Sequence, residues 1–248
     1  MNRVIEIERE FDALIPFIDG KKVCDLVGLS PSFDNADYIF ESDKIVMELK
    51  CLEENKLVDK NIQQKLYSLL GRWKKEGHNI NLTHDGWKAT VRDLPPELSK
   101  QILKIYAKPI RKRIVKANKQ IKETKKALSC LDYQGVLLLA NDGNLAIDPE
   151  HVYSILNYVL GQNYSGINAV IFFTVNQLGR ASFTNVDTAI WANLNRDGFT
   201  PINDSFFNKL SNGWMLHLEQ VLDTMIPMFQ LSEEEDFKKI VNANTDLA

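Results

Sequence analysis

The sequence lacks the features that mark secreted, zinc-bound or membrane-spanning proteins. Its three cysteines, Cys24, Cys51 and Cys130, are too widely spaced for a disulfide framework or a zinc motif, and its four histidines are scattered. The longest apolar run, INAVIFF at 167–173, is too short to cross a bilayer. The N-terminus is charged and has no apolar signal core. We therefore expect a cytoplasmic protein that makes no use of a membrane.

Charge is unevenly distributed along a chain of ordinary composition. Of the 248 residues, 44% are hydrophobic and 25% are charged, and the net charge is −3, as in a typical globular protein. Between Lys104 and Lys126, however, ten basic residues accompany one acidic residue, Glu123. This segment carries +9 and leaves −12 for the remainder. Net charge alone therefore predicts no nucleic-acid partner, but its distribution separates a basic segment from an acidic body.

Apolar periodicity and turn residues predict an α/β fold. Helices are expected at 4–18, 59–75, 96–128 with an interruption at Pro109, 148–161 and 205–229. Strands are expected at 23–29, 36–40, 44–52, 135–142 and 167–175, with a small hairpin at 78–95. This order implies a mixed β-sheet flanked by helices. We expect a core over 1–175, which includes a basic helical segment at 97–128. A C-terminal helical extension at 176–248 would pack on the core and end in a partly disordered tail.

The predicted strand at 44–52 carries charges where a buried strand would carry only apolar residues. Alternation places Glu48 and Lys50 on one face, and a hairpin with the preceding strand would bring Asp37 close to Glu48. Two adjacent carboxylates repel, so either one holds a proton or a cation binds between them. Mg²⁺ is typically held by one or two carboxylates together with phosphate oxygens and water. A nearby lysine would stabilise the phosphate charge. The stretch therefore has the composition of a metal-dependent phosphodiesterase site.

These residues resemble the signature of a known superfamily. Asp37, ten intervening residues and then Glu48-Leu49-Lys50 resemble the PD-(D/E)XK nucleases, which have the restriction-endonuclease-like fold. Gln63 and Tyr67, on the next predicted helix, resemble the Gln-x-x-x-Tyr motif of the RecB-like branch. The resemblance covers the element order over about 5–175, although members usually have proline where this chain has alanine, before the first aspartate.

The resemblance implies an αβββαβ-type core and cleavage of phosphodiester bonds with Mg²⁺, for which Mn²⁺ could substitute. Asp37 and Glu48 would be metal ligands, and Lys50 would be the catalytic lysine. Gln63 and Tyr67 would support the site or contact the substrate.

The same family pattern suggests a third metal ligand and a substrate. A glutamate on the first helix often joins the metal site, and Glu6 and Glu10 are the candidates here, of which we prefer Glu10. The favoured substrate is DNA. A homodimer would suit restriction-type cleavage of duplexes, by analogy with the family alone.

The basic segment allows two interpretations. Ile114, Ala117 and Ile121 form an apolar stripe that would pack on the body, while lysines recur away from part of that stripe. They form either a solvated helix face or a track for nucleic-acid phosphates, whose binding would depend steeply on salt. The candidate nucleic-acid contacts are Lys108, Arg111, Lys112, Lys116 and Lys119.

Other functions stay open at this point. A Glu-x-Lys pair on a strand is often only a weak ion pair on a half-exposed face. The chain could then be a catalytically inactive member of the same fold that binds nucleic acid or protein, as an immunity-type module would. A third interpretation is an α/β protein that binds a small anionic ligand at the end of a strand. It predicts that the carboxylates of Asp37 and Glu48 lie apart.

Overall fold

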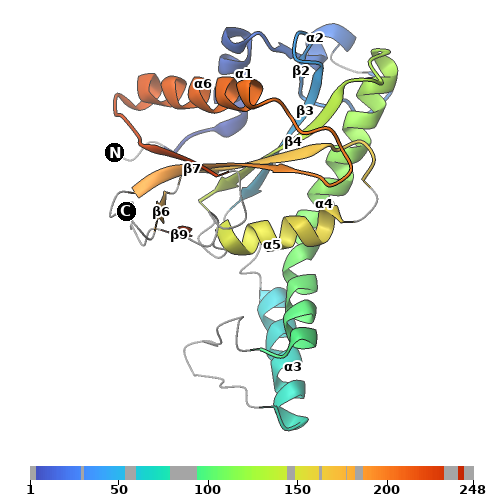
Figure 1. Cartoon of the computed structure of the whole chain (residues 1–248), viewed down its shortest axis with the longest axis vertical. Helices are drawn as coiled ribbons and strands as arrows, with labels where there is room; N and C mark the ends of the chain where they lie inside the picture. Colours follow the sequence, from blue (N-terminus) through green and yellow to red (C-terminus); the bar gives the residue numbers. More distant parts are fainter. Residues whose placement is uncertain are drawn as a thin grey trace.

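The structure is a computed structural model. It describes residues 4–28, 31–53, 60–78, 94–143, 149–161, 164–176, 178–181, 187–231 and 240–242. Within these residues, the strands form one mixed sheet in the order β1-β2-β3-β4-β5-β7-β6-β9, and β8 pairs with β7. Helices cover both faces of the sheet (Figure 1). The predicted α/β class, with a mixed sheet flanked by helices, is confirmed.

The sheet changes from antiparallel to parallel pairing at β3. Strands β1, β2 and β3 form an antiparallel meander, β3, β4 and β5 are parallel, and β7 returns antiparallel to β5. The strands span Lys21–Lys22 (β1), Tyr38–Phe40 (β2), Ile45–Glu53 (β3), Gln134–Asp142 (β4), Ala169–Val175 (β5), Gly179–Ala181 (β6), Asp187–Asn195 (β7), Met228–Leu231 (β8) and Ile240–Asn242 (β9). The predicted strands that became β2, β3, β4 and β5 are confirmed.

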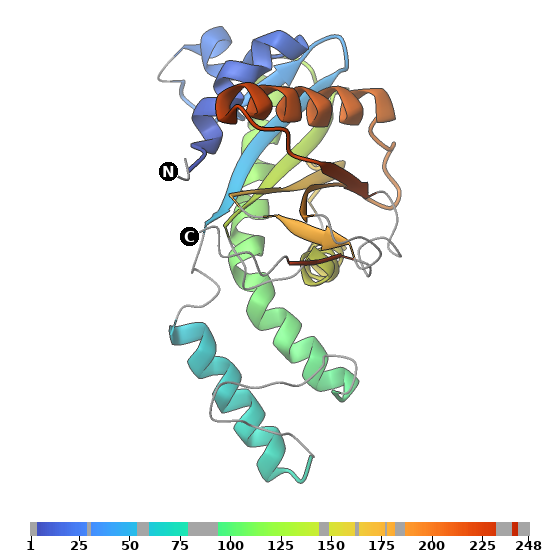
Figure 2. The same cartoon turned by 90° about the vertical axis from the view of Figure 1, so that its left-hand side faces the viewer.

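Two helical layers and one projecting arm surround the sheet. Helices α1 and α6 cover one face, and α5 with the second half of α4 covers the other (Figure 1). Helix α3 pairs with the first half of α4, and together they project from the body as an arm (Figure 2). The helices span Ile7–Leu14 (α1, followed by the 3-10 turn η1 at Ile15–Ile18), Val23–Val27 (α2), Lys60–Lys75 (α3), Pro96–Ala127 (α4), Pro149–Leu160 (α5) and Asp204–Leu222 (α6). None of the described helices is both long and apolar enough to cross a membrane.

Two sequence-based assignments near the N-terminus and in α4 were wrong. The segment predicted as a strand at 23–29 forms helix α2, of which only Val23 is buried. A short apolar run cannot distinguish a strand from a short helix. The predicted interruption at Pro109 is also absent, because α4 is one continuous helix. Proline removes one backbone hydrogen bond, but Ala107 and Ile110 on either side of it are buried and hold the helix in place.

The C-terminal region differs from the predicted helical extension. The helix expected at 205–229 ends at Leu222, where Asp223 adopts a left-handed conformation with φ of 51°. The chain then enters β8, which pairs in parallel with β7. Strands β6 to β9 all lie in the region 176–248, so this region extends the sheet as well as adding a helix. The hairpin predicted at 78–95 and the C-terminal tail lie almost entirely outside the described residues.

Candidate functional site

Strand pairing brings Asp37 and Glu48 together. Tyr38 is paired with Met47 in the β2–β3 register, so the preceding residue, Asp37, lies opposite Glu48. The backbone N–H of Leu49 donates a hydrogen bond of 2.8 Å to Asp37 Oδ2. This contact fixes the Asp37 carboxyl against β3. The hairpin predicted from the sequence therefore produces the expected juxtaposition of the two carboxyls.

Glu48 is the most unusual side chain of the sheet, because it is charged and has no solvent exposure. It lies on the face that α4 covers, together with Val46 and Leu52, while Met47 and Leu49 point to the opposite face. Its Oε1 accepts a hydrogen bond from Lys50 Nζ. Its Oε2 is buried and has no hydrogen-bond donor within the described structure. An orphaned oxygen of this kind is costly unless a proton or a cation binds it.

Asp37 and Lys50, which together with Glu48 are called the trio below, are both partly exposed to solvent. The side chain of Lys50 is 18% exposed, although its ammonium group contacts the fully buried Glu48 carboxyl. Asp37 is also only partly buried. Within the site, solvent therefore reaches Asp37 and Lys50 but not Glu48.

Burial shifts the pKa of both carboxyl groups toward the protonated form. The pKa of Glu48 is raised to about 8, first by burial and then by the charge of Asp37, while Lys50 opposes both effects. The pKa of Asp37 is raised as well, because burial outweighs the Leu49 N–H, Lys50 and Glu48, each of which lowers it. A proton on Glu48 would let its carboxyl donate a hydrogen bond to Asp37. The third interpretation, a small anionic ligand bound at the end of a strand, predicted that the carboxyls of Asp37 and Glu48 lie apart. They lie together instead.

The donor set suits a hard divalent cation better than zinc. Within the described residues, no three or more His, Cys, Asp or Glu side chains form a cluster that could hold a metal ion, as structural zinc requires. Mg²⁺ needs only one or two carboxylates, because substrate oxygens and water complete its shell. The orphaned Oε2 of Glu48 beside the Asp37 carboxyl meets that requirement.

Helix α4 holds the segment that leads into Asp37. The sequence did not predict these contacts. Thr124 Oγ1 accepts a 2.7 Å hydrogen bond from the N–H of Ala36, and Gln120 Nε2 donates a 2.9 Å bond to the carbonyl of Asn35. Both α4 side chains are buried. The available signal was the presence of two polar residues, i and i+4, in line with an otherwise apolar stripe.

The side chain of Glu10 contacts Arg9 and His217, whereas a third metal ligand would be expected to approach Asp37 and Glu48. Its Oε1 accepts a hydrogen bond of 2.6 Å from Arg9 Nη2, and its Oε2 lies 2.8 Å from His217 Nε2 on α6. The hydrogen bond from Arg9 is the main reason why the pKa of Glu10 is lowered. Glu8, two residues before Glu10 on α1, is the glutamate whose charge raises the pKa of Asp37. Sequence reasoning considered Glu6 and Glu10 and passed over Glu8.

Gln63 and Tyr67 do not join the trio in the described contacts. Both lie on α3 in the projecting arm, where Gln63 is exposed and Tyr67 is 45% exposed. The apolar face of α3 packs against the first half of α4 instead of the sheet. Gln63 and Tyr67 therefore lie i and i+4 on one helix, as predicted, but that helix is in the arm that projects from the body (Figure 2).

The predicted nucleic-acid contacts lie mainly on the outer surface of α4. Lys108, Lys112, Lys116 and Lys119 are exposed, on the side of the helix opposite the buried Ile110, Ala117 and Ile121. Arg111 is only partly exposed, and its Nε is buried without a hydrogen-bond partner within the described structure. These residues do not line the Asp37–Glu48 pair, because α4 itself stands between them.

Comparisons with protein-family models, with curated proteins and with solved structures gave no match. Function is therefore argued from the geometry of the site.

Proposed function

We propose that this protein is a metal-dependent phosphodiesterase, a nuclease of the PD-(D/E)XK type that hydrolyses DNA. The observation that carries the proposal is the fully buried Glu48, whose unpartnered oxygen lies beside a second carboxyl, Asp37, with the Lys50 ammonium next to both. A fold that needed only stability would gain more from an apolar residue at this position.

The topology supports the same proposal. Helix α1 precedes the antiparallel strands β1, β2 and β3, after which α3 and α4 form the crossover to β4, parallel to β3. This order is similar to the αβββαβ order that the resemblance implies, except that β1 has only two residues and helix α2 lies between β1 and β2. Asp37 lies at the start of the second strand, and Glu48 and Lys50 lie on the third.

Each residue of the trio has a distinct chemical role. Asp37 and Glu48 would hold Mg²⁺ through their carboxylates, and Mn²⁺ could take its place. The bound ion would supply a Lewis acid that polarises the phosphate and lowers the pKa of a coordinated water. Lys50, whose side chain is partly exposed, would bind a phosphate oxygen and stabilise the negative charge that develops on it.

A cleavage assay tests the proposal. Labelled single-stranded and duplex DNA and RNA are incubated with Mg²⁺ or Mn²⁺ and with wild type or Glu48→Gln. The variant keeps the shape of the side chain but loses its charge, so we expect cleavage to fall by at least about 100-fold, as on removal of a group that stabilises transition-state charge. Glu41→Gln, in the exposed turn between β2 and β3, is the matched control and should cleave as wild type does. Equal cleavage by Glu48→Gln and wild type would refute the assignment.

A second candidate function is a catalytically inactive member of the same fold that binds nucleic acid or protein, as an immunity-type module would. It is favoured by the exposed lysines of α4, which face away from the carboxyl pair, and by the Lys50–Glu48 contact, which already satisfies half of the Glu48 carboxyl. It predicts binding that is indifferent to Mg²⁺ and no cleavage with any metal. The same assay, read for binding as well as cleavage, separates the two candidates.

A further inference from the structure

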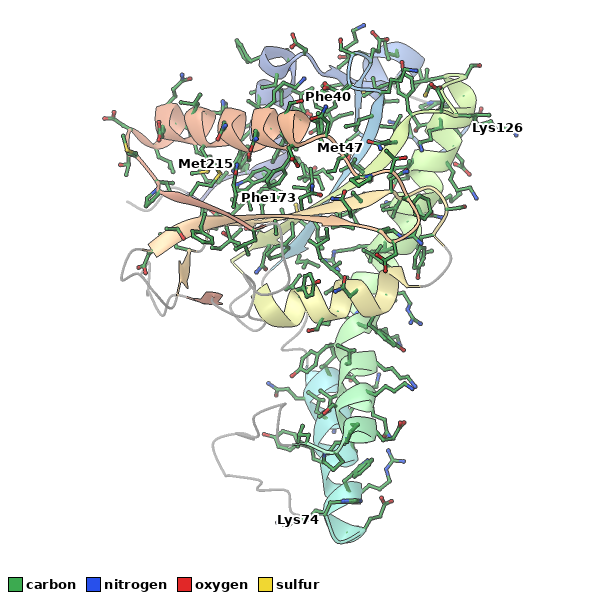
Figure 3. The ribbon with its side chains drawn as sticks, in the orientation of Figure 1. Phe40, Met47, Lys74, Lys126, Phe173 and Met215 are labelled. Carbon is green, nitrogen blue, oxygen red and sulfur yellow. The ribbon has the colours of Figure 1, made fainter. Side chains whose placement is uncertain are left out.

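Helix α4 presents a continuous row of lysines to solvent. We name as the lysine row the seven exposed lysines Lys104, Lys108, Lys112, Lys116, Lys119, Lys122 and Lys126. At 3.6 residues per turn they share an arc of roughly 120° centred opposite the buried stripe, and they extend over about 33 Å. Figure 3 shows Lys126 at the body end of this row, directed away from the sheet. The row is therefore a linear feature on one side of the molecule.

The lysine row has little internal compensation for its charge. Lys119 is the one member that has a carboxylate partner within the described structure, with Asp34 at 2.8 Å and Glu123 at 3.8 Å. Lysines at i and i+4, such as Lys108 and Lys112, repel and destabilise a helix. A solvated face selected for stability would alternate glutamate with lysine. A row without such alternation indicates an anionic partner whose charges are also arranged in a line.

The chemistry of the row favours a duplex over a single strand. Single-stranded nucleic acids bind to basic grooves that also offer aromatic side chains for base stacking. Among the described residues of α4, the one exposed large hydrophobic side chain is Val115, and it is aliphatic. The row therefore offers charge without stacking platforms, which suits a phosphate backbone whose bases are already paired.

The length of the row sets the length of duplex that it can contact. A straight row about 33 Å long that lies along the axis of B-form DNA passes about ten base pairs, or one helical turn. Lysines spread over an arc of roughly 120° can then reach phosphates of both strands where the two backbones face α4.

We propose that the lysine row binds the phosphate backbone of duplex DNA, without base specificity, over about ten base pairs, since 33 Å corresponds to about ten steps of 3.4 Å. The proposal rests on the proposed function, which makes DNA the substrate, and it adds a second site. Because the row and the Asp37–Glu48 pair lie on opposite sides of α4, the row holds DNA and takes no part in cleavage.

Fluorescence anisotropy with labelled duplexes of 6, 10, 14 and 20 base pairs tests the length and salt dependence, in chelator so that no cleavage occurs. We expect affinity per binding site to rise up to about ten base pairs and then level off. Seven phosphate contacts predict that the logarithm of the binding constant falls with the logarithm of salt concentration with a slope of about −6. Single-stranded DNA of equal length is included, and it should bind more weakly than duplex DNA.

The variant is the triple substitution Lys108→Gln, Lys112→Gln and Lys116→Gln. It should weaken binding at least tenfold and bring the salt slope closer to zero by about three. The control changes the net charge by the same −3 on the exposed face of α6, through Asn208→Glu, Asn212→Glu and Gln220→Glu, and should bind within twofold of wild type. Equal weakening by both would show a net-charge effect and overturn the proposal, as would unchanged binding by the lysine variant.

Failure of this proposal and failure of the nuclease proposal are distinguishable. Glu48→Gln should bind duplexes as tightly as wild type even though it does not cleave them. Binding that follows the lysine row without any cleavage would support the row and favour the binding-module candidate. Cleavage that depends on Glu48, with binding unaffected by the row, would support the nuclease and refute the row.

Discussion

The two faces of the sheet are built from the same strands but differ in chemistry. The face beneath α1 and α6 is closed by a set of aromatic side chains, with Phe173 stacked on Trp191 at 4.6 Å and Phe11 stacked on Trp214 at 4.1 Å. Figure 3 shows Phe40, Met47, Phe173 and Met215 grouped on this side. The face beneath α4 and α5 is mainly aliphatic, and it contains Glu48.

Strand β3 contributes to both faces within four consecutive residues. Met47 and Leu49 enter the aromatic face, whereas Glu48 and Lys50 enter the aliphatic one. Met47 and Leu49 bury apolar side chains, as packing of the core requires. The second pair places a buried carboxyl where methionine or leucine would also fit the β-strand pattern, so packing alone does not account for it.

Removing a large side chain from the aromatic face should produce the largest loss of stability. Phe173→Ala leaves a cavity beside Trp191 and Trp214, and we expect a loss of about 3–5 kcal/mol in the free energy of unfolding. Glu48→Met should change it by less than about 1 kcal/mol or stabilise the protein, because Lys50 still has Asp37 nearby. Urea unfolding followed by circular dichroism measures both. A loss in Glu48→Met as large as that in Phe173→Ala would show that Glu48 is structural.

The pH dependence of stability should also separate the two faces. The pKa of Glu48 is raised from its usual value of 4.5 to about 8, so the folded state binds more protons than the unfolded state between these values. Stability therefore falls as pH rises through this window, by up to about 1.4 kcal/mol per pH unit, and levels off above it. Wild type minus Glu48→Gln isolates this contribution in urea unfolding from pH 5 to 9. A difference that is flat with pH would contradict the buried, perturbed carboxyl.

A smaller effect is expected at the support of the site. Thr124→Val removes the acceptor for the buried N–H of Ala36, and such a loss costs about 1–3 kcal/mol. Because this contact fixes the chain immediately before Asp37, we expect weaker divalent-ion binding as well. Thr124→Ser keeps the hydroxyl and should retain ion affinity. Equal ion affinity in all three proteins, measured by calorimetry, would show that the contact does not position the site.

The smallest effect is expected at the surface ion pair between Asp34 and Lys119, a member of the lysine row. Lys119 and Asp34 are both more than half exposed, and exposed ion pairs contribute little to stability. Lys119→Gln and Asp34→Asn should each unfold at the same urea concentration as wild type. A clear shift of the midpoint in either variant would mean that the loop before Asp37 depends on this pair.

The sequence predicted the core of this arrangement because the decisive signals are local. Strict alternation at 44–52 and the short polar turn before it determine which residues of β3 share a face. They were sufficient to place Asp37 opposite Glu48. The long apolar runs that became β4 and β5 left few alternatives to buried strands.

The failures came where the structure depends on contacts distant in sequence. The spacing of Gln63 and Tyr67 shows that they share a helix face but not where that helix packs, and the apolar face of α3 finds α4 instead of the sheet. The choice of Glu10 over Glu6 as a third ligand stays a prediction, and the sequence alone does not reveal that His217, 207 residues later, contacts one of the Glu10 oxygens. Thr124 was missed for the same reason, since its partner lies 88 residues away.

Isothermal titration of Mg²⁺ and Mn²⁺ into wild type, Asp37→Ala and Glu48→Gln tests the central claim most directly. The account predicts saturable binding to wild type that weakens as pH falls below about 8, where protons compete for Glu48. It also predicts that binding is lost in both variants while their folds are retained. Absence of ion binding by wild type at pH 8, or equal binding by all three proteins, would contradict it.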